Sequence, residues 1–191
     1  MLFSLSEIFD AIIMSLAIGF IFVNYFSRFN TFKRPNYYDI VGRKRFNWSD
    51  FWFSAALVAP AVLLHELGHK MLALFFGMSA IFNASYFGLG LGVFLKLIGS
   101  PFLFFIPAYV SITGAGTPLQ FSAIAFAGPF VNLVLWLGAA YVLKNIKMSR
   151  KYTPFLYLTS KINMFLFIFN MIPIPGFDGY KVLSGIVSLI F

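Results

Sequence analysis

Long apolar runs separated by short polar stretches make up most of the chain. Four runs are long enough to cross a lipid bilayer as helices, which takes about 20 residues each. We therefore predict transmembrane helices at about residues 8–26, 51–76, 118–143 and 154–172. Because neither an internal repeat nor a soluble stretch divides the sequence, we expect a single domain over residues 1–191.

The segment 77–117 is apolar enough to enter a membrane, but its apolar run is broken. It could form a fifth full span, or a re-entrant element with short β-like pieces near residues 79–84 and 105–113. Irregular backbone at membrane depth is tolerated where it is buried in protein or lines a water-filled cavity. The interruptions are Gly88, Gly90, Gly92, Lys96, Gly99 and Pro101.

The composition is typical of a membrane protein. Of the 191 residues, 60% are hydrophobic and 10% are charged, whereas a soluble domain carries about a quarter charged residues. We therefore predict a mostly α-helical, polytopic protein that crosses the cell membrane several times. The chain has no cysteine, which excludes both a disulfide framework and a thiolate metal site.

Two short basic clusters supply most of the net charge of +8. Residues 27–48 carry six Lys or Arg, and residues 144–151 carry four more. Such clusters suit loops at the anionic surface of a lipid bilayer better than they suit nucleic-acid binding. With four spans, both clusters lie on the same side of the membrane, which the positive-inside rule makes cytoplasmic.

The chain's only two histidines, His65 and His69, both fall in the second apolar run. Four residues apart on a helix, they lie about 40° apart around its axis and about 6 Å apart along it, so both imidazoles can reach one metal ion. Glu66 points to the flank of that face and suits holding a metal-bound water. This is the His-Glu-x-x-His arrangement of zinc proteases. A chance string on a buried helix is the alternative, but polar side chains at membrane depth are costly and usually mark function.

A catalytic zinc takes three protein ligands, and the third must here be a carboxylate. Besides Glu66 the acids are Glu7, Asp10, Asp39, Asp50 and Asp178. Asp50 begins the helix of the histidines about 22 Å away. Glu7 and Asp10 resemble first-turn charges, and Asp39 lies in a basic loop. Asp178 remains as the predicted ligand, although an Asp before Gly is also an ordinary turn signal.

A shared zinc ion also decides how the segment 77–117 runs. If that segment crossed the membrane, the fourth apolar run would end on the side opposite His65 and His69, and Asp178 would be too far away. A re-entrant segment brings Asp178 back to the histidines. We therefore predict about four spans plus a re-entrant, partly β element near 77–117.

The stretches "HELGHK", "AGPFVN" and "INMFLFIFNMIPIPGFDG" together resemble the site-2 protease family of intramembrane zinc metalloproteases. The resemblance implies that His65, His69 and Asp178 bind one Zn²⁺ per chain and that Glu66 is the catalytic base. It also suggests an active site nearer the cytosol, the reverse of the orientation that the basic clusters favour. Gly128 and Asn132 match an element thought to line the substrate site, and Asn170 is a further candidate there. Either asparagine could instead bridge helices.

These features predict an intramembrane zinc metalloprotease that hydrolyses peptide bonds in or near transmembrane helices. Zinc would activate a water, and Glu66 would accept its proton as general base. The expected substrates are single-span membrane proteins in the lipid bilayer, whose helix must unwind, for example by adding a strand beside 79–84 or 105–113. The alternatives are an inactive membrane scaffold and a metal-handling membrane protein of the same fold.

Overall fold

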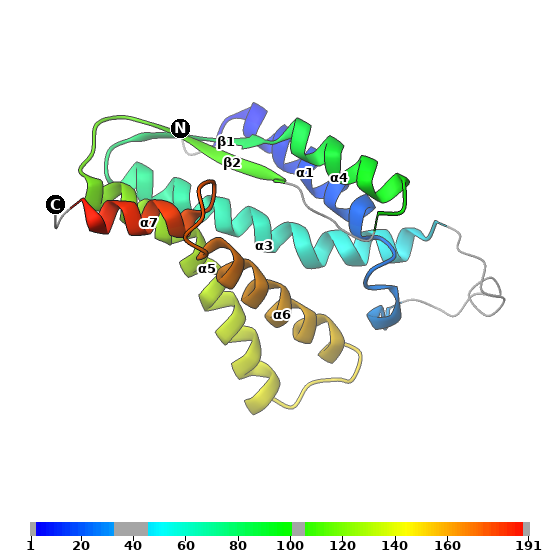
Figure 1. Cartoon of the computed structure of the whole chain (residues 1–191). Coiled ribbons are helices and arrows are strands. Elements are labelled where there is room, and N and C mark those ends of the chain that lie inside the picture. Colours follow the sequence, from blue (N-terminus) through cyan, green and yellow to red (C-terminus); the bar gives the residue numbers. More distant parts are fainter. Residues whose placement is uncertain (1–2, 33–45, 101–105, 189–191) are drawn as a thin grey trace.

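A computed structural model describes residues 3–32, 46–100 and 106–188. Helix α3 (Trp48–Phe75) runs through the middle of the molecule (Figure 1). Helix α1 (Leu5–Phe22), helix α4 (Tyr86–Leu97) and a two-stranded sheet lie on one side of α3. The other side carries α5 (Pro118–Asn145) and α6 (Thr153–Asn170), while α7 (Asp178–Val187) packs against α5. Asp39 and Pro101, which the sequence analysis considered, lie outside the described residues.

Local capping signals set where the long helices begin. In α1, the Ser4 hydroxyl accepts from the N–H of Glu7, and the Glu7 carboxylate accepts from the N–H of Ser4. Asn47 caps α3 by accepting from two backbone N–H groups. Thr117 caps α5, again with a reciprocal bond from the third helical residue. These side chains satisfy N–H groups that have no partner inside the helix, which explains why the boundaries lie near the predicted ones.

Three helices, α1, α3 and α5, are long and apolar enough to cross a membrane. These match the first three predicted spans. The fourth prediction, residues 154–172, coincides with α6, which has 18 residues like α1 but includes Lys161 and several polar side chains. Since α6 is not among the three apolar helices, a fourth span stays a prediction.

The segment between α3 and α5 leaves and returns at the same end of α3. Strand β1 (Ser79–Ala84) pairs antiparallel with β2 (Ala108–Thr113), and Ser79 lies opposite Thr113. Helix α5 begins shortly after Thr113, so the segment does not join opposite ends of the bundle. Both strands lie where β-like pieces were predicted, and the chain runs in the sense that a shared metal site requires.

Helix α4 was not predicted, because its glycines read as breaks. Gly88 is needed for the chain to return close by, since a Cβ there would lie 3.0 Å from the carbonyl carbon of Ile106. At the other end of α4, the Lys96 amino group donates to the carbonyl of Ile21, 2.8 Å away, at the end of α1. Contacts with the rest of the fold therefore stabilise α4, whose glycines have low helix propensity.

The two acids of α1 do more than the predicted first-turn role. A Glu7 carboxylate oxygen accepts from the backbone N–H of Phe82 at 2.7 Å, and the Asp10 carboxylate accepts from that of Ala84 at 3.0 Å. Both N–H groups belong to the edge of β1 that faces away from β2. The carboxylates therefore join α1 to the sheet.

The described ends of the two basic clusters meet at the other end of the bundle. The Thr31 hydroxyl donates to the carbonyl of Lys151, and the rings of Phe32 and Tyr152 are 5.5 Å apart. The parts of these two segments that the structure describes thus lie at the same end of the bundle, as the four-span arrangement requires. Which side of the membrane this end faces stays a prediction.

Candidate metal centre

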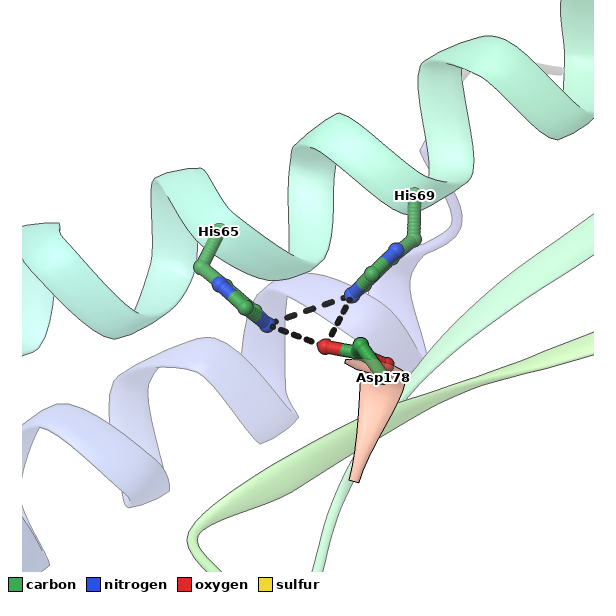
Figure 2. A group of neighbouring side chains, drawn as sticks. All are labelled: His65, His69 and Asp178. Atoms are coloured by element: carbon green, nitrogen blue, oxygen red, sulfur yellow. Dashed lines mark hydrogen bonds and ion pairs between the residues drawn. The ribbon is translucent and has the colours of Figure 1, made fainter. Parts of the chain in front are cut away.

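Three candidate ligands predicted from the sequence come together in the structure. His65 and His69 project from one face of α3, and Asp178, the first residue of α7, points at both imidazoles from the opposite side (Figure 2). The His65 Nε2 atom lies 3.2 Å from Asp178 Oδ2 and 3.2 Å from His69 Nε2. The His69 Nε2 atom lies 3.3 Å from the same carboxylate oxygen. All three residues are buried, and we call them the zinc group.

The spacing of these atoms fits one tetrahedral metal ion. Nitrogen and oxygen ligands at about 2.0–2.2 Å from a tetrahedral zinc lie about 3.3 Å from each other. The three measured separations are 3.2, 3.2 and 3.3 Å. Two histidines and one carboxylate are also a donor set that catalytic zinc sites use, with a fourth position left for water or substrate.

The second ring nitrogen of each histidine has its own partner in α5. His65 Nδ1 lies 2.6 Å from the Oδ1 of Asn132, and His69 Nδ1 lies 2.7 Å from the carbonyl oxygen of Ile124. Because both partners are acceptors, each Nδ1 carries the proton. A neutral imidazole then presents the lone pair of Nε2 to the centre of the group, as metal binding requires.

Gly128 of α5 keeps the space beside the imidazoles open. A Cβ at this position would lie 2.6 Å from Cε1 of His69 and 2.9 Å from Nε2 of His65. Gly68 of α3 plays a similar part in bringing the helices together, since a Cβ there would lie 2.7 Å from the carbonyl oxygen of Ala127. The two glycines allow α3 and α5 to approach closely where the zinc group lies.

Close packing at the start of α7 holds Asp178 in place. A Cβ at Gly179 would lie 2.9 Å from the Cα of Met171, so only glycine fits between α7 and the end of α6. Further along, the Ser122 hydroxyl of α5 donates to the carbonyl of Val182 at 2.9 Å. The Asp-Gly pair is therefore a helix start and not the simple turn that was the alternative.

The Asp178 carboxylate turns one oxygen, Oδ2, toward both histidines. Its other oxygen, Oδ1, lies 3.8 Å from the amino group of Lys181, which is largely exposed.

Glu66 lies beside the zinc group without belonging to it. Its side chain is buried and close enough to His65, His69 and Asp178 for electrostatic interaction. Within residues 3–32, 46–100 and 106–188, no group hydrogen bonds to its carboxylate. The carboxylate is thus available to accept a proton, which agrees with the predicted placement on the flank of the histidine face.

The two asparagines suggested for substrate binding differ in position. Asn132 is fully buried, and its amide donates to the carbonyl of Ala61 and to the side chain of Asn163. Asn170 donates to the carbonyl of Leu166 in its own helix, and no bond to the zinc group is found in the described part of the chain. Substrate contact by either residue stays a prediction. Asn163 was missed, because nothing in its sequence spacing marks it.

A second buried polar cluster lies on the side of α3 that faces α1, and it begins at the residue next to His69. The Lys70 amino group donates to the Glu7 carboxylate, and the same carboxylate oxygen accepts from the N–H of Phe82. Lys70 is 1% exposed and Glu7 is 5% exposed. We call Lys70, Glu7 and the N–H of Phe82 the ion-pair cluster.

Curated proteins resemble this chain over 70% to 95% of its length. It is 37% identical over 188 residues to the "Putative zinc metalloprotease MJ0611" of Methanocaldococcus jannaschii, a match that covers 95% of this chain and 85% of that protein. This chain belongs to a family of zinc metalloproteases. It is also 33% identical over 135 residues to the "Putative zinc metalloprotease sll0528" of Synechocystis sp. and 27% identical over 150 residues to the "Zinc metalloprotease MJ0392" of M. jannaschii.

The last two matches cover 70% and 78% of this chain, which spans only 31% and 39% of those longer proteins. No family model matches the chain, and no solved structure matches it. Membership in a zinc metalloprotease family and the buried group of His65, His69 and Asp178, which could hold a metal ion, agree on the cofactor. That cofactor is Zn²⁺.

Proposed function

We propose that this zinc metalloprotease works inside the membrane, as the site-2 protease family does, and hydrolyses peptide bonds in or near transmembrane helices of single-span proteins. The observation that carries this proposal is the position of the zinc group. Two of its members project from the interior of α3, which is 28 residues long and apolar enough to cross a membrane. Ligands on such a helix favour chemistry at membrane depth.

In this proposal His65, His69 and Asp178 hold the zinc ion. When bound, zinc supplies Lewis acidity, which polarises the scissile carbonyl and acidifies the attacking water. Glu66 accepts the proton of that water and passes it to the leaving amine. The lack of a hydrogen-bond partner for the Glu66 carboxylate within the described residues supports this role, because a base must be free to take up a proton.

The exposed edge of β2 is the proposed place for an unwound substrate. A helical substrate hides its carbonyls in hydrogen bonds and must become extended, and an extended peptide can join a sheet edge. The outer edge of β1 is occupied, because Glu7 and Asp10 accept from its N–H groups. In an antiparallel pair, the backbone N–H and C=O groups of Ala108, Val110 and Ile112 then face outward from β2. No hydrogen bond to them occurs within the described ranges.

The proposed topology is a multi-pass protein of the cell membrane. Helix α6 forms the fourth span beside α1, α3 and α5, and the segment 77–117 enters and leaves the bilayer on one side. Two features support this topology. The strands pair so that the segment returns to the level at which it started, and helix α4 packs along α1.

Cleavage of a panel of tagged single-span proteins in liposomes tests the proposal. Purified wild-type protein with zinc should cut at least one of them within or next to its transmembrane helix, and Glu66→Gln should not. Zinc binding without cleavage of any of the panel or of soluble peptides would favour a scaffold. Zinc movement across the liposome membrane without cleavage would favour a metal-handling protein.

A further inference from the structure

A line of hydrogen bonds runs from His65 through α5 into α6. His65 Nδ1 contacts Asn132 Oδ1 at 2.6 Å, Asn132 Nδ2 donates to Asn163 Oδ1 at 2.9 Å, and Asn163 Nδ2 donates to the carbonyl of Thr159 at 2.8 Å. Asn132 is 0% exposed and Asn163 is 1% exposed. Water is thus excluded from the line, and each polar atom depends on its protein partner.

The bonds of this line have one consistent direction. The backbone carbonyl of Thr159 can only accept, so the amide nitrogen of Asn163 must face it and the Asn163 oxygen must face Asn132. The Asn132 nitrogen, which also donates to the carbonyl of Ala61, then faces α6, and its oxygen faces His65. An oxygen at that place requires the proton of His65 on Nδ1.

We propose that Asn163 is a positioning residue for zinc binding, acting on His65 through Asn132. By holding the Asn132 amide in one orientation, it keeps the His65 proton on Nδ1 and the Nε2 lone pair directed at the other members of the zinc group. This inference rests on the proposed role of His65 as a ligand. It gives Asn132 a positioning role as well, and it makes the α5–α6 contact part of the metal site.

The other histidine shows why such a line is needed at His65. His69 Nδ1 contacts the carbonyl oxygen of Ile124, a backbone group that can only accept. Its proton is therefore fixed without help. A side-chain amide can rotate and offer either its oxygen or its nitrogen. Asn132 therefore keeps the proton of His65 on Nδ1 only if its own orientation is fixed. Asn163 supplies that constraint at 2.9 Å, together with the carbonyl of Ala61 at 3.1 Å, since both accept from the Asn132 amide nitrogen.

The test is the zinc affinity of purified variants in competition with a chelator. Asn163→Leu keeps roughly the side-chain size but removes the acceptor, and we expect about 10- to 100-fold weaker zinc binding. Asn163→Asp keeps an oxygen for Asn132 and should bind nearly as the wild type does. Ser160→Ala is the matched control, because Ser160 is also buried in α6 and donates to α5, at the carbonyl of Trp136, yet lies outside the line. Its zinc affinity should stay within about twofold.

A double-mutant cycle separates positioning from simple packing. In an Asn132→Ala background, Asn163→Leu should cause no further loss of zinc affinity, since its effect passes through Asn132. An equal loss in both backgrounds, or wild-type affinity in Asn163→Leu, would overturn the inference. If Asn163→Leu does not fold, Asn163→Ser takes its place, because its hydroxyl is too short to reach Asn132. Wild-type protein that binds no zinc would refute the proposed function too, whereas normal zinc binding and cleavage with an unaffected Asn163→Leu would refute only this inference.

Discussion

Helix α3 carries two buried polar clusters, one on each side, and they differ in how their charges are balanced. In the ion-pair cluster, the cation of Lys70 meets the anion of Glu7, and the N–H of Phe82 completes the carboxylate's bonding. In the zinc group, two imidazole nitrogens and one carboxylate oxygen meet at 3.2–3.3 Å, and all three are acceptors once the Nδ1 protons are fixed.

The difference separates a cluster that supports the fold from one that binds a ligand. The ion-pair cluster is complete within the chain and joins α1, α3 and β1. The zinc group gathers electron pairs that repel one another unless a cation lies between them. Two adjacent residues of α3, His69 and Lys70, therefore belong to clusters of opposite kind, and the contrast can be tested from both sides.

The largest expected effect follows removal of a zinc ligand. Wild-type protein should hold about one zinc per chain, and His65→Ala or His69→Ala should lose it together with all cleavage, because two remaining ligands bind zinc weakly. Asp178→Asn should weaken zinc retention or abolish cleavage while the bundle stays folded. Metal analysis and circular dichroism on the same preparations measure this. Full zinc occupancy with normal cleavage in Asp178→Asn would remove Asp178 from the zinc group.

Glu66→Gln sharpens the comparison by separating zinc binding from chemistry. The amide cannot take a proton, so cleavage should fall by about 10²- to 10⁴-fold, the usual contribution of a general base. Zinc content should stay near the wild-type level, because Glu66 is not in the zinc group. Metal analysis and cleavage are measured on one preparation, and unchanged cleavage would exclude Glu66 from the mechanism.

Lys70→Met should lower the stability of the fold without changing any residue of the zinc group. It leaves the Glu7 carboxylate buried without its cation, which costs about 3–5 kcal/mol of stability. The double variant Glu7→Gln/Lys70→Met removes both charges and should recover most of that loss, because the amide oxygen still accepts from Phe82. Unfolding by titration with a denaturing detergent compares the three proteins. A double variant as unstable as Lys70→Met would contradict the pairing.

Lys181→Ala should have the smallest effect. Its amino group lies 3.8 Å from the second oxygen of Asp178 but is largely exposed, and solvent screens such a pair. We expect less than about a twofold change in zinc affinity, measured by chelator competition. A larger change would mean that the charge of Lys181 takes part in balancing the zinc group.

Local signals predicted much of this fold, and the zinc group could be predicted because choices were few. The apolar runs at about 51–76 and 118–143 placed α3 and α5 to within a few residues, and Asn47 and Thr117 cap these helices in the structure. Asp178 followed from elimination among five carboxylates and from the need to return to His65 and His69. Each step depended on sequence spacing or on a small number of candidates.

The rest depended on contacts between distant residues. Glu7 has the local signature of a capping residue, which conceals its bond to Lys70, 63 positions away. Helix α4 contains three glycines, each about 1 kcal/mol less favourable than alanine, and is packed along α1. Asn163 lies among apolar residues of α6 at no distinctive spacing. Only its contact with Asn132 reveals its connection to the metal site.

The separation of 113 positions between His65 and Asp178 bears on how the protein is made. At about 5–20 residues per second, roughly 6–23 s pass between the synthesis of His65 and that of Asp178. During this interval the nascent chain has two histidines and a glutamate but no complete set of ligands. Under the proposed function, newly inserted helices beside it would therefore not be cut until the last ligand has been translated and α7 has docked.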